Sequence, residues 1–252
     1  MRKPRLSQVF LHNEDVLRRI AESANITKND TVFEIGGGKG QLTKQLVNFA
    51  KKVIVCEIDK LLIPYLRELD VEIINESILD IDIPKEADVI VGNIPYRLSS
   101  DITEKVLRSG KKAVILYQKE FADRLVAKPS TNDYSRITIL AQLLSTPKRL
   151  FNVSRNNFNP VPKVDSTLVE FTPKAEKYDE GFSKFTRILF EFKNKSVKNA
   201  LINGRREWAG IEDKRKIRDL ITNFTEKKVK DLSIEEIKDE YKKAKLLNKE
   251  FW

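Results

Sequence analysis

Short apolar runs alternate with amphipathic segments along the first two thirds of the chain. The apolar runs are rich in β-branched residues, which is typical of buried strands. These predicted strands are 31–35, 53–57, 71–75, 87–92 and 112–117. The amphipathic segments predict helices at 14–24, 41–47, 61–69, 99–108, 119–127 and 134–144. Regular alternation of strand and helix indicates a parallel sheet in an open α/β fold.

Two further strand-like runs, 147–153 and 164–172, follow the last of these helices. A proline-rich segment, 157–162, joins them without a long crossover, so we expect an antiparallel pair at one edge of the sheet. The total is seven strands. The sequence therefore predicts an α/β, Rossmann-like fold with a seven-stranded, mostly parallel sheet.

The pattern changes at residues 173–181 and is helical from there to residue 252. Phe182, Phe185 and Leu189 recur at helical spacing, and Ser233 with Glu236 resembles a capping box that opens the last helix. We expect two domains, 1–175 with a basic N-terminal arm and 176–252 as a small all-α domain.

Three glycines, Gly36, Gly38 and Gly40, lie between the first strand of the sheet and the next helix. Their G-x-G-x-G spacing differs from the dinucleotide fingerprint G-x-G-x-x-G, because position 41 is Gln. Such a loop lets a ligand approach bare backbone at a helix N-terminus. The following strand ends in Glu57, which is suited to a ribose diol. These features indicate an adenosine-containing ligand without a pyrophosphate, S-adenosylmethionine foremost; the alternative is a turn that only closes a β-α unit.

Asn93, Ile94, Pro95 and Tyr96 follow the strand that ends at Gly92, at the edge of the sheet that holds the glycine loop. An Asn side-chain oxygen and a nearby backbone carbonyl can accept both hydrogens of an adenine amine and draw its nitrogen towards tetrahedral geometry. Pro95 stiffens the turn and Tyr96 can stack on the base. The alternative is an ordinary Asn-Pro turn with a core tyrosine.

Seven segments, in order, resemble successive motifs of the ribosomal RNA adenine dimethyltransferase family, particularly its archaeal branch. They are 34–40, 57–59, 93–100, 118–125, 133–136, 158–166 and 192–201. The resemblance runs from about Leu6 to Leu201 and is weak beyond it, where only the helical character carries over.

The resemblance implies a class I methyltransferase that transfers methyl groups from S-adenosylmethionine to N6 of two adjacent adenosines near the 3′ end of small-subunit ribosomal RNA, with a role in subunit biogenesis. The implied cofactor-binding residues are Gln8, Leu11, Gly36, Gly38, Glu57, Ile58, Glu76, Ser77 and Asn93. The residues implied to hold the target base are Asn93, Ile94, Pro95 and Tyr96, with Phe158 stacked on its other face. A core role is the alternative for Phe158.

Four positions depart from the family pattern. Ser7 replaces a glycine, and Val9 replaces a polar residue, so a contact at position 9 must use the backbone. Glu76 replaces the aspartate implied to bind the adenine amine of the cofactor, and Asp101 replaces a proline. We expect weaker cofactor affinity from these departures, without loss of a transfer residue.

The chain carries 47 Lys and Arg against 37 Asp and Glu, a net charge of +10. This surplus indicates a polyanionic partner, nucleic acid before membrane, and small-subunit rRNA or a pre-30S particle by the resemblance. The alternative is the charge-rich surface of a heat-adapted protein. The candidate RNA-binding residues are Arg2, Lys3, Arg5, Lys193, Lys195, Lys198, Arg205 and Arg206.

One Cys and one His exclude a disulfide framework and make a metal site improbable. The apolar runs are too short to span a membrane, and a secretory signal is not recognised, so we expect a cytoplasmic protein, monomeric by default. Two other function classes remain open: a non-catalytic RNA-binding assembly or transcription factor on the same fold, and a large-subunit rRNA adenine methyltransferase.

Overall fold

A computed structural model describes residues 9–248 of the chain. The chain divides into two compact units: unit 1 is Met1–Asp123 with Leu144–Ala175, and unit 2 is Arg124–Leu143 with Glu176–Trp252. The candidate residues Arg2, Lys3, Arg5 and Gln8 and the departure at Ser7 lie outside the described part.

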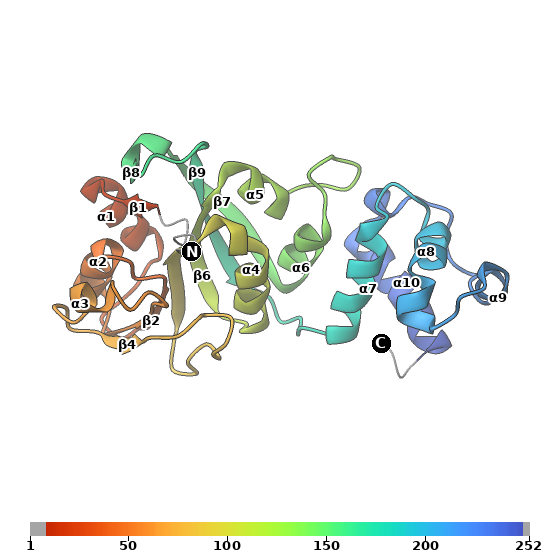
Figure 1. Ribbon diagram of the computed structural model, residues 1–252, viewed down its shortest axis with the longest axis horizontal. Coiled ribbons are helices and arrows are strands. Elements are labelled where there is room, and N and C mark those ends of the chain that lie inside the picture. The colour runs from red at the N-terminus through yellow and green to blue at the C-terminus, as the bar shows by residue number, and fades with distance from the viewer. Residues whose placement is uncertain (1–8, 249–252) are drawn as a thin grey trace, which may run out of the picture. The chain divides into compact units, whose positions relative to one another are not determined.

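Unit 1 is built on the predicted seven-stranded sheet, with strand order β4-β3-β2-β5-β6-β9-β7 (Figure 1). The strands are β2 (Thr31–Ile35), β3 (Lys52–Cys56), β4 (Glu72–Ile74), β5 (Val89–Asn93), β6 (Lys112–Gln118), β7 (Ser145–Val153) and β9 (Ser166–Pro173). Pairing is parallel from β4 to β6 and antiparallel for β6–β9 and β9–β7. The predicted fold class and the antiparallel edge pair are confirmed. The central strands are buried at nearly every position, which explains their continuous apolar runs.

The helices of unit 1 follow the predicted alternation. They are α1 (Glu14–Ser23), α2 (Gln41–Phe49), α3 (Ile63–Leu66), α4 (Ser99–Arg108) and α5 (Lys119–Leu125), which ends just inside unit 2. α1 packs against α2 (Figure 1). α3 is shorter than the predicted helix 61–69. Proline is tolerated only in the first turn of a helix, so Pro64 places the start of α3 at Ile63, and the flanking residues form turns.

A second, two-stranded sheet was not predicted. β1 (Phe10–Leu11) pairs antiparallel with β8 (Phe158–Asn159), with Phe10 opposite Asn159 and Leu11 opposite Phe158. Two residues are too few to show the alternation of a strand, so the pattern carried no signal. The β1–β8 ribbon brings the start of the described chain beside the proline-rich segment 157–162. This segment begins at the last residue of the short helix η2 (Arg155–Asn157).

Unit 2 is helical and contains α6 (Arg136–Leu144, except its last residue), α7 (Glu180–Glu191), α8 (Val197–Ala209), α9 (Lys214–Leu220), η3 (Val229–Asp231) and α10 (Ile234–Leu247). The grouping of residues 124–143 with these helices differs from the two-domain prediction. Tyr134 explains it: its hydroxyl donates to the Leu232 carbonyl oxygen at 2.8 Å, and its ring meets Phe190 at 5.8 Å between centroids.

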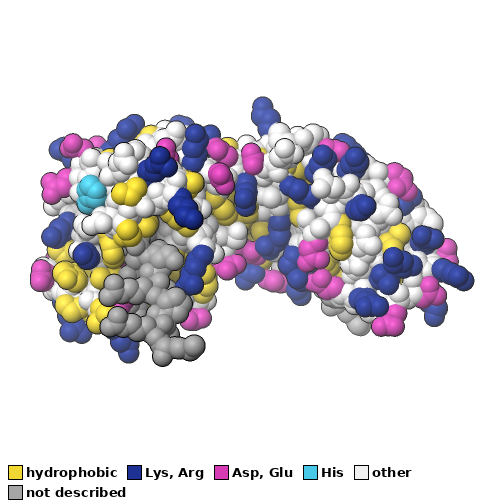
Figure 2. Space-filling model, turned by 45° about the horizontal axis from the view of Figure 1, so that its top comes forward, with side chains coloured by type: hydrophobic (Ala, Val, Ile, Leu, Met, Phe, Trp, Pro, Cys, Tyr) yellow, Lys and Arg dark blue, Asp and Glu magenta, His cyan; other side chains and the backbone are white. Residues whose placement is uncertain are grey.

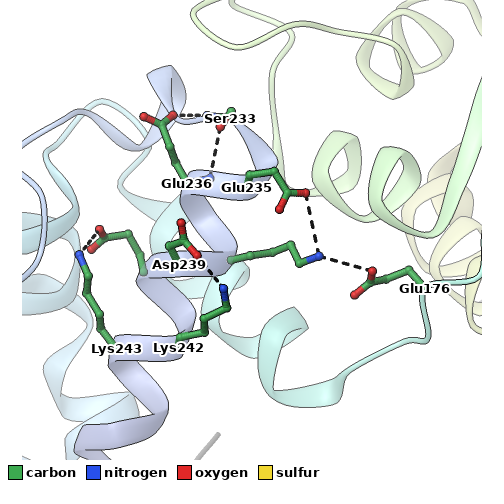
Figure 3. A network of polar contacts seen from close by, with 9 residues as sticks. Glu176, Ser233, Glu235, Glu236, Asp239, Lys242 and Lys243 are labelled. Carbon is green, nitrogen blue, oxygen red and sulfur yellow. Dashed lines mark hydrogen bonds and ion pairs between the residues drawn. The ribbon is translucent and has the colours of Figure 1, made fainter.

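The last helix, α10, begins with the capping box that the sequence predicted. The Glu236 amide donates to Ser233 Oγ at 3.2 Å, and the Ser233 amide donates to Glu236 Oε2 at 2.7 Å. Figure 3 shows polar contacts along the same helix, among them the ion pair of Lys242 with Asp239. Lys238 also pairs with Glu176 at 3.4 Å. Within residues 9–248, every helix is too short or too polar to cross a membrane.

Candidate functional site

A cavity of about 320 Å³ lies at the carboxyl ends of β2, β3 and β5. This volume is in the range of small-ligand sites. The cavity brings together most of the residues predicted to bind cofactor or target base: Leu11, Gly36, Gly38, Glu57, Ile58, Glu76, Ser77, Asn93, Ile94 and Pro95. Their shared position at one sheet edge follows from the parallel strand order, because parallel strands end on the same side.

The floor of the cavity is the glycine loop between β2 and α2. Gly36 and Gly38 have φ angles of 79° and 58°, which side chains rarely adopt. Gly37 has a different constraint, because a Cβ there would lie 2.4 Å from Val55 Cγ1. The loop therefore exposes backbone to a ligand, and glycine is required at Gly36 and Gly38 by conformation and at Gly37 by lack of space.

Glu57 fixes the loop from the neighbouring strand. Its carboxylate accepts from the Gly38 amide at 2.9 Å and from the Asp59 amide at 2.8 Å, and the residue is only 5% exposed. Each oxygen keeps a lone pair for a further donor, such as a ribose hydroxyl. The carboxylate is thus oriented before any ligand arrives.

Glu34 is a cavity residue to which the sequence analysis gave no role. It is 1% exposed, and neither carboxylate oxygen has a hydrogen-bond partner among the described residues. Burial raises the pKa of Glu34 to about 8. The nearby Thr43 hydroxyl acts against this increase, and the Glu57 carboxylate adds to it. An unpaired buried carboxyl beside a cavity is suited to a cationic or hydrogen-bond-donating ligand group. Its position two residues before the first glycine was the available signal.

The raised pKa of Glu34 predicts a pH-dependent stability of the cofactor-free protein. Since its folded pKa of about 8 exceeds the ordinary 4.5, the folded state holds an extra proton between these values. The stabilising contribution is full below pH 4.5 and is lost as pH rises towards 8. We expect Glu34→Gln to remove this loss, so that its Tm exceeds that of wild type by roughly 5 °C at pH 9 and by much less at pH 5.

Thermal denaturation across this pH range measures the effect. Glu72→Gln is the matched control, because Glu72 is an exposed acid of β4 paired with Lys52 at 2.7 Å. Parallel Tm profiles for wild type and Glu34→Gln would contradict the prediction.

Asn93 ends β5 and has an asymmetric environment. Its Nδ2 donates to the Val9 carbonyl oxygen at 3.4 Å, whereas its Oδ1 is buried without a partner among the described residues. Val9 therefore makes its contact through the backbone. A buried amide oxygen without a donor is costly, so Oδ1 is an acceptor available to a ligand.

The two aromatic residues predicted to hold the base differ in position. Tyr96 is half-buried in η1 (Tyr96–Leu98), and its hydroxyl is 2.8 Å from Ser166 Oγ, which anchors the ring. Burial raises the pKa of Tyr96. Phe158 is 1% exposed and belongs to the hydrophobic core of unit 1. The structure shows the core position for Phe158, and stacking on a base requires this ring to become exposed.

Two further cavity residues were missed as site residues. Phe10 lies over the glycine loop, with Lys39 Nζ 5.2 Å from its ring centroid. Arg97 is exposed and lines the cavity next to Pro95. No pattern in the sequence points to Phe10, because its position depends on the unpredicted β1–β8 ribbon.

The five predicted RNA-binding residues of unit 2 differ in exposure and in hydrogen-bond partners. Lys195 and Arg206 are exposed. Lys198 pairs with Glu226 at 3.1 Å, and Lys193 Nζ donates to the Asn132 carbonyl oxygen at 2.9 Å. Arg205 is only 9% exposed and donates to the backbone carbonyl oxygens of Glu212 and Ile202, so its role here is structural and the RNA-binding prediction for it is not supported.

Basic and acidic side chains are interspersed on the face seen in Figure 2. His12 is exposed. Among residues 9–248, the acidic, His and Cys side chains form no group able to hold a metal ion.

Comparison with known proteins identifies the family of this chain. The family model "Ribosomal RNA adenine dimethylase" matches residues 1–243. The probable ribosomal RNA small subunit methyltransferase A of Methanopyrus kandleri is 38% identical over 233 residues, which cover 88% of this chain and 83% of the relative.

Two solved structures are similar over most of the chain. A dimethyladenosine transferase from Plasmodium falciparum has a TM-score of 0.76 and 30% identity, covering 94% of this chain and 96% of the other. The 23S rRNA methyltransferase ErmE has a TM-score of 0.65 and 26% identity, covering 93% and 99%. The match of the family model over nearly the whole chain, with the cavity just described, shows that this chain belongs to the ribosomal RNA adenine dimethylase family.

Proposed function

We propose that this protein transfers methyl groups from S-adenosylmethionine to N6 of two adjacent adenosines near the 3′ end of small-subunit rRNA. The observation that carries the proposal is the buried Oδ1 of Asn93, which has no hydrogen-bond partner within residues 9–248 and lines a cavity with a glycine loop. The small-subunit branch is favoured over the large-subunit enzymes by 38% identity to the Methanopyrus protein against 26% to ErmE.

The cavity residues fit the cofactor. The glycine loop admits close backbone approach, and Glu57 is held to accept ribose hydroxyls. The Glu34 carboxyl, which has no hydrogen-bond partner among residues 9–248, can accept a hydrogen bond from a donor group of the cofactor. Glu76 is exposed at the wall, where the adenine amine would find an acceptor. S-adenosylmethionine supplies an activated methyl group on a sulfonium whose positive charge disappears during transfer.

The protein's part is to orient the target amine. Asn93 Oδ1 accepts one N6 hydrogen, and a backbone carbonyl of the Asn93–Tyr96 turn accepts the other. The nitrogen lone pair is then freed from the ring for in-line attack, and positioning supplies most of the rate enhancement. The proton lost from N6 leaves to solvent after transfer. Burial raises the pKa of the Cys56 thiol to about 12, so this cavity residue is no thiolate nucleophile.

The partners follow from the same proposal. The substrate is small-subunit rRNA in a pre-30S particle, and the exposed Lys195 and Arg206 of α8 and its preceding turn contact phosphates. The protein acts as a monomer in the cytoplasm, without membrane or metal.

The test is transfer of labelled methyl from S-adenosylmethionine to unmodified small subunits, with large subunits and free RNA beside them. Mass spectrometry of nuclease digests identifies the product. We expect N6,N6-dimethyladenosine in small-subunit rRNA. Binding of the particle without any transfer would instead support a non-catalytic assembly factor, and transfer to large subunits alone would support the other enzyme class.

A further inference from the structure

The β1–β8 ribbon is closed by two asparagine side chains that the proposed reaction does not use. Asn13 Nδ2 donates to Asn157 Oδ1 at 2.9 Å, and the His12 amide donates to the Asn157 carbonyl oxygen at 3.0 Å. Asn13 and Asn157 are 144 positions apart in the sequence. We call this pair the asparagine clasp.

Each member of the clasp is itself fixed by local backbone. Asn13 is the N-cap of α1, and its Oδ1 accepts from the Val16 amide at 3.1 Å. Asn157 Nδ2 donates to the Ser154 carbonyl oxygen at 3.0 Å at the end of η2. The N-cap bond assigns the Asn13 oxygen and nitrogen, so its amide has one orientation and its Nδ2 is the donor.

The clasp acts at the point where the ribbon reaches Asn93. Val9 directly precedes β1, and its carbonyl oxygen is the acceptor for Asn93 Nδ2. This hydrogen bond orients the Asn93 side-chain amide, with Nδ2 towards Val9 and Oδ1 away from it. With Nδ2 held there, Oδ1 is left as an acceptor that no other residue of the described chain occupies.

A two-residue ribbon has little pairing of its own, and tertiary contacts must hold it. Leu11 and Phe158 are both nearly fully buried, which fixes the ribbon against the core, and the clasp fixes its register along the strand direction. We infer that loss of the clasp would let β1 shift, so that the Val9 carbonyl oxygen would move away from Asn93 Nδ2.

We propose that Asn13 and Asn157 are positioning residues, which hold the Val9 carbonyl against Asn93 and thereby present the Asn93 Oδ1 to the target amine. This inference rests on the proposed role of Asn93. It extends the site to side chains that contact neither cofactor nor substrate.

Asn13→Asp is the most informative variant, because aspartate keeps the N-cap acceptor but has no donor for Asn157. We expect kcat to fall about tenfold, the KM for S-adenosylmethionine to change less than threefold, and Tm to stay within about 2 °C. Asn157→Asp keeps the acceptor for Asn13 and should retain kcat within about threefold. Asn157→Ala should resemble Asn13→Asp. Asn48→Asp is the matched control, since exposed Asn48 of α2 also donates a single amide bond, to the Lys44 carbonyl oxygen.

Two readouts separate positioning from a merely structural role. In the Asn93→Ala background, Asn13→Asp should reduce the single-turnover rate by less than twofold, because the clasp acts through Asn93. Hydrogen exchange of residues 10–12 should accelerate in Asn13→Asp and not in Asn157→Asp.

Three results would each overturn the proposal. The first is a wild-type kcat in Asn13→Asp, and the second is an equal loss of kcat in Asn157→Asp and Asn157→Ala. The third is a tenfold fall in the single-turnover rate when Asn13→Asp is added to Asn93→Ala. Absence of dimethyladenosine with the wild-type protein would instead overturn the proposed function, and the hydrogen-exchange comparison would still test the clasp.

Discussion

Replacing Asn93 by Ala should lower kcat for methyl transfer by about 10²–10³-fold, comparable to the loss of one hydrogen-bonding group that stabilises a transition state. The variant removes the unpartnered Oδ1 that we propose accepts an N6 hydrogen. It leaves the glycine loop and Glu57 intact, so cofactor affinity should fall no more than about tenfold. Single-turnover rates on unmodified small subunits, with calorimetric cofactor titration, measure both quantities.

Asn48→Ala is the control for Asn93→Ala, because it truncates an exposed asparagine of the same unit. Asn93→Asp adds a second comparison: it keeps an acceptor oxygen but places a carboxylate against the Val9 carbonyl, so an intermediate rate is expected. More than a third of wild-type kcat in Asn93→Ala would rule out the proposed acceptor.

Replacing Glu57 by Gln should raise the Kd for S-adenosylmethionine by roughly 50-fold. The carboxylate accepts from two backbone amides, whereas the glutamine side chain offers one acceptor and one donor, so the Gly38 or Asp59 amide loses its partner. Hydrogen bonds to charged groups contribute about 1.5–3 kcal/mol each, and 1.4 kcal/mol is tenfold in Kd.

At saturating cofactor, kcat of Glu57→Gln should stay within about threefold of wild type, which distinguishes a binding role from a role in transfer. The matched control is again Glu72→Gln, whose exposed ion pair contributes little. An unchanged Kd would show that Glu57 serves only the loop and not the cofactor.

The sheet could be predicted because each of its strands carries a local signal. The central strands are apolar at successive positions, and the helix Ser99–Arg108 has the predicted bounds because its apolar face repeats at helical spacing. The edge pair followed from the short connection between β7 and β9. Strand order then placed Gly36, Glu57 and Asn93 at one edge without further information.

What could not be predicted depends on contacts between distant segments. The β1–β8 ribbon joins two-residue strands with no periodicity, so Phe10 and the asparagine clasp were invisible in sequence. Phe158 in a proline-rich loop resembles an exposed stacking residue, and only its pairing partner shows that it is buried. In the sequence, Arg205 cannot be distinguished from its exposed neighbour Arg206. Only the structure shows that Arg205 donates to the carbonyl oxygens of residues 202 and 212.

The interleaving of the two units limits how this protein can be rearranged in evolution. The chain passes between unit 1 and unit 2 after residues 123, 143 and 175. A single recombination event at residue 175 would exchange α7 to α10 but leave residues 124–143 behind, so Tyr134 would lose both Leu232 and Phe190. An exchange that keeps these contacts would have to carry residues 124–143 along with residues 176–252.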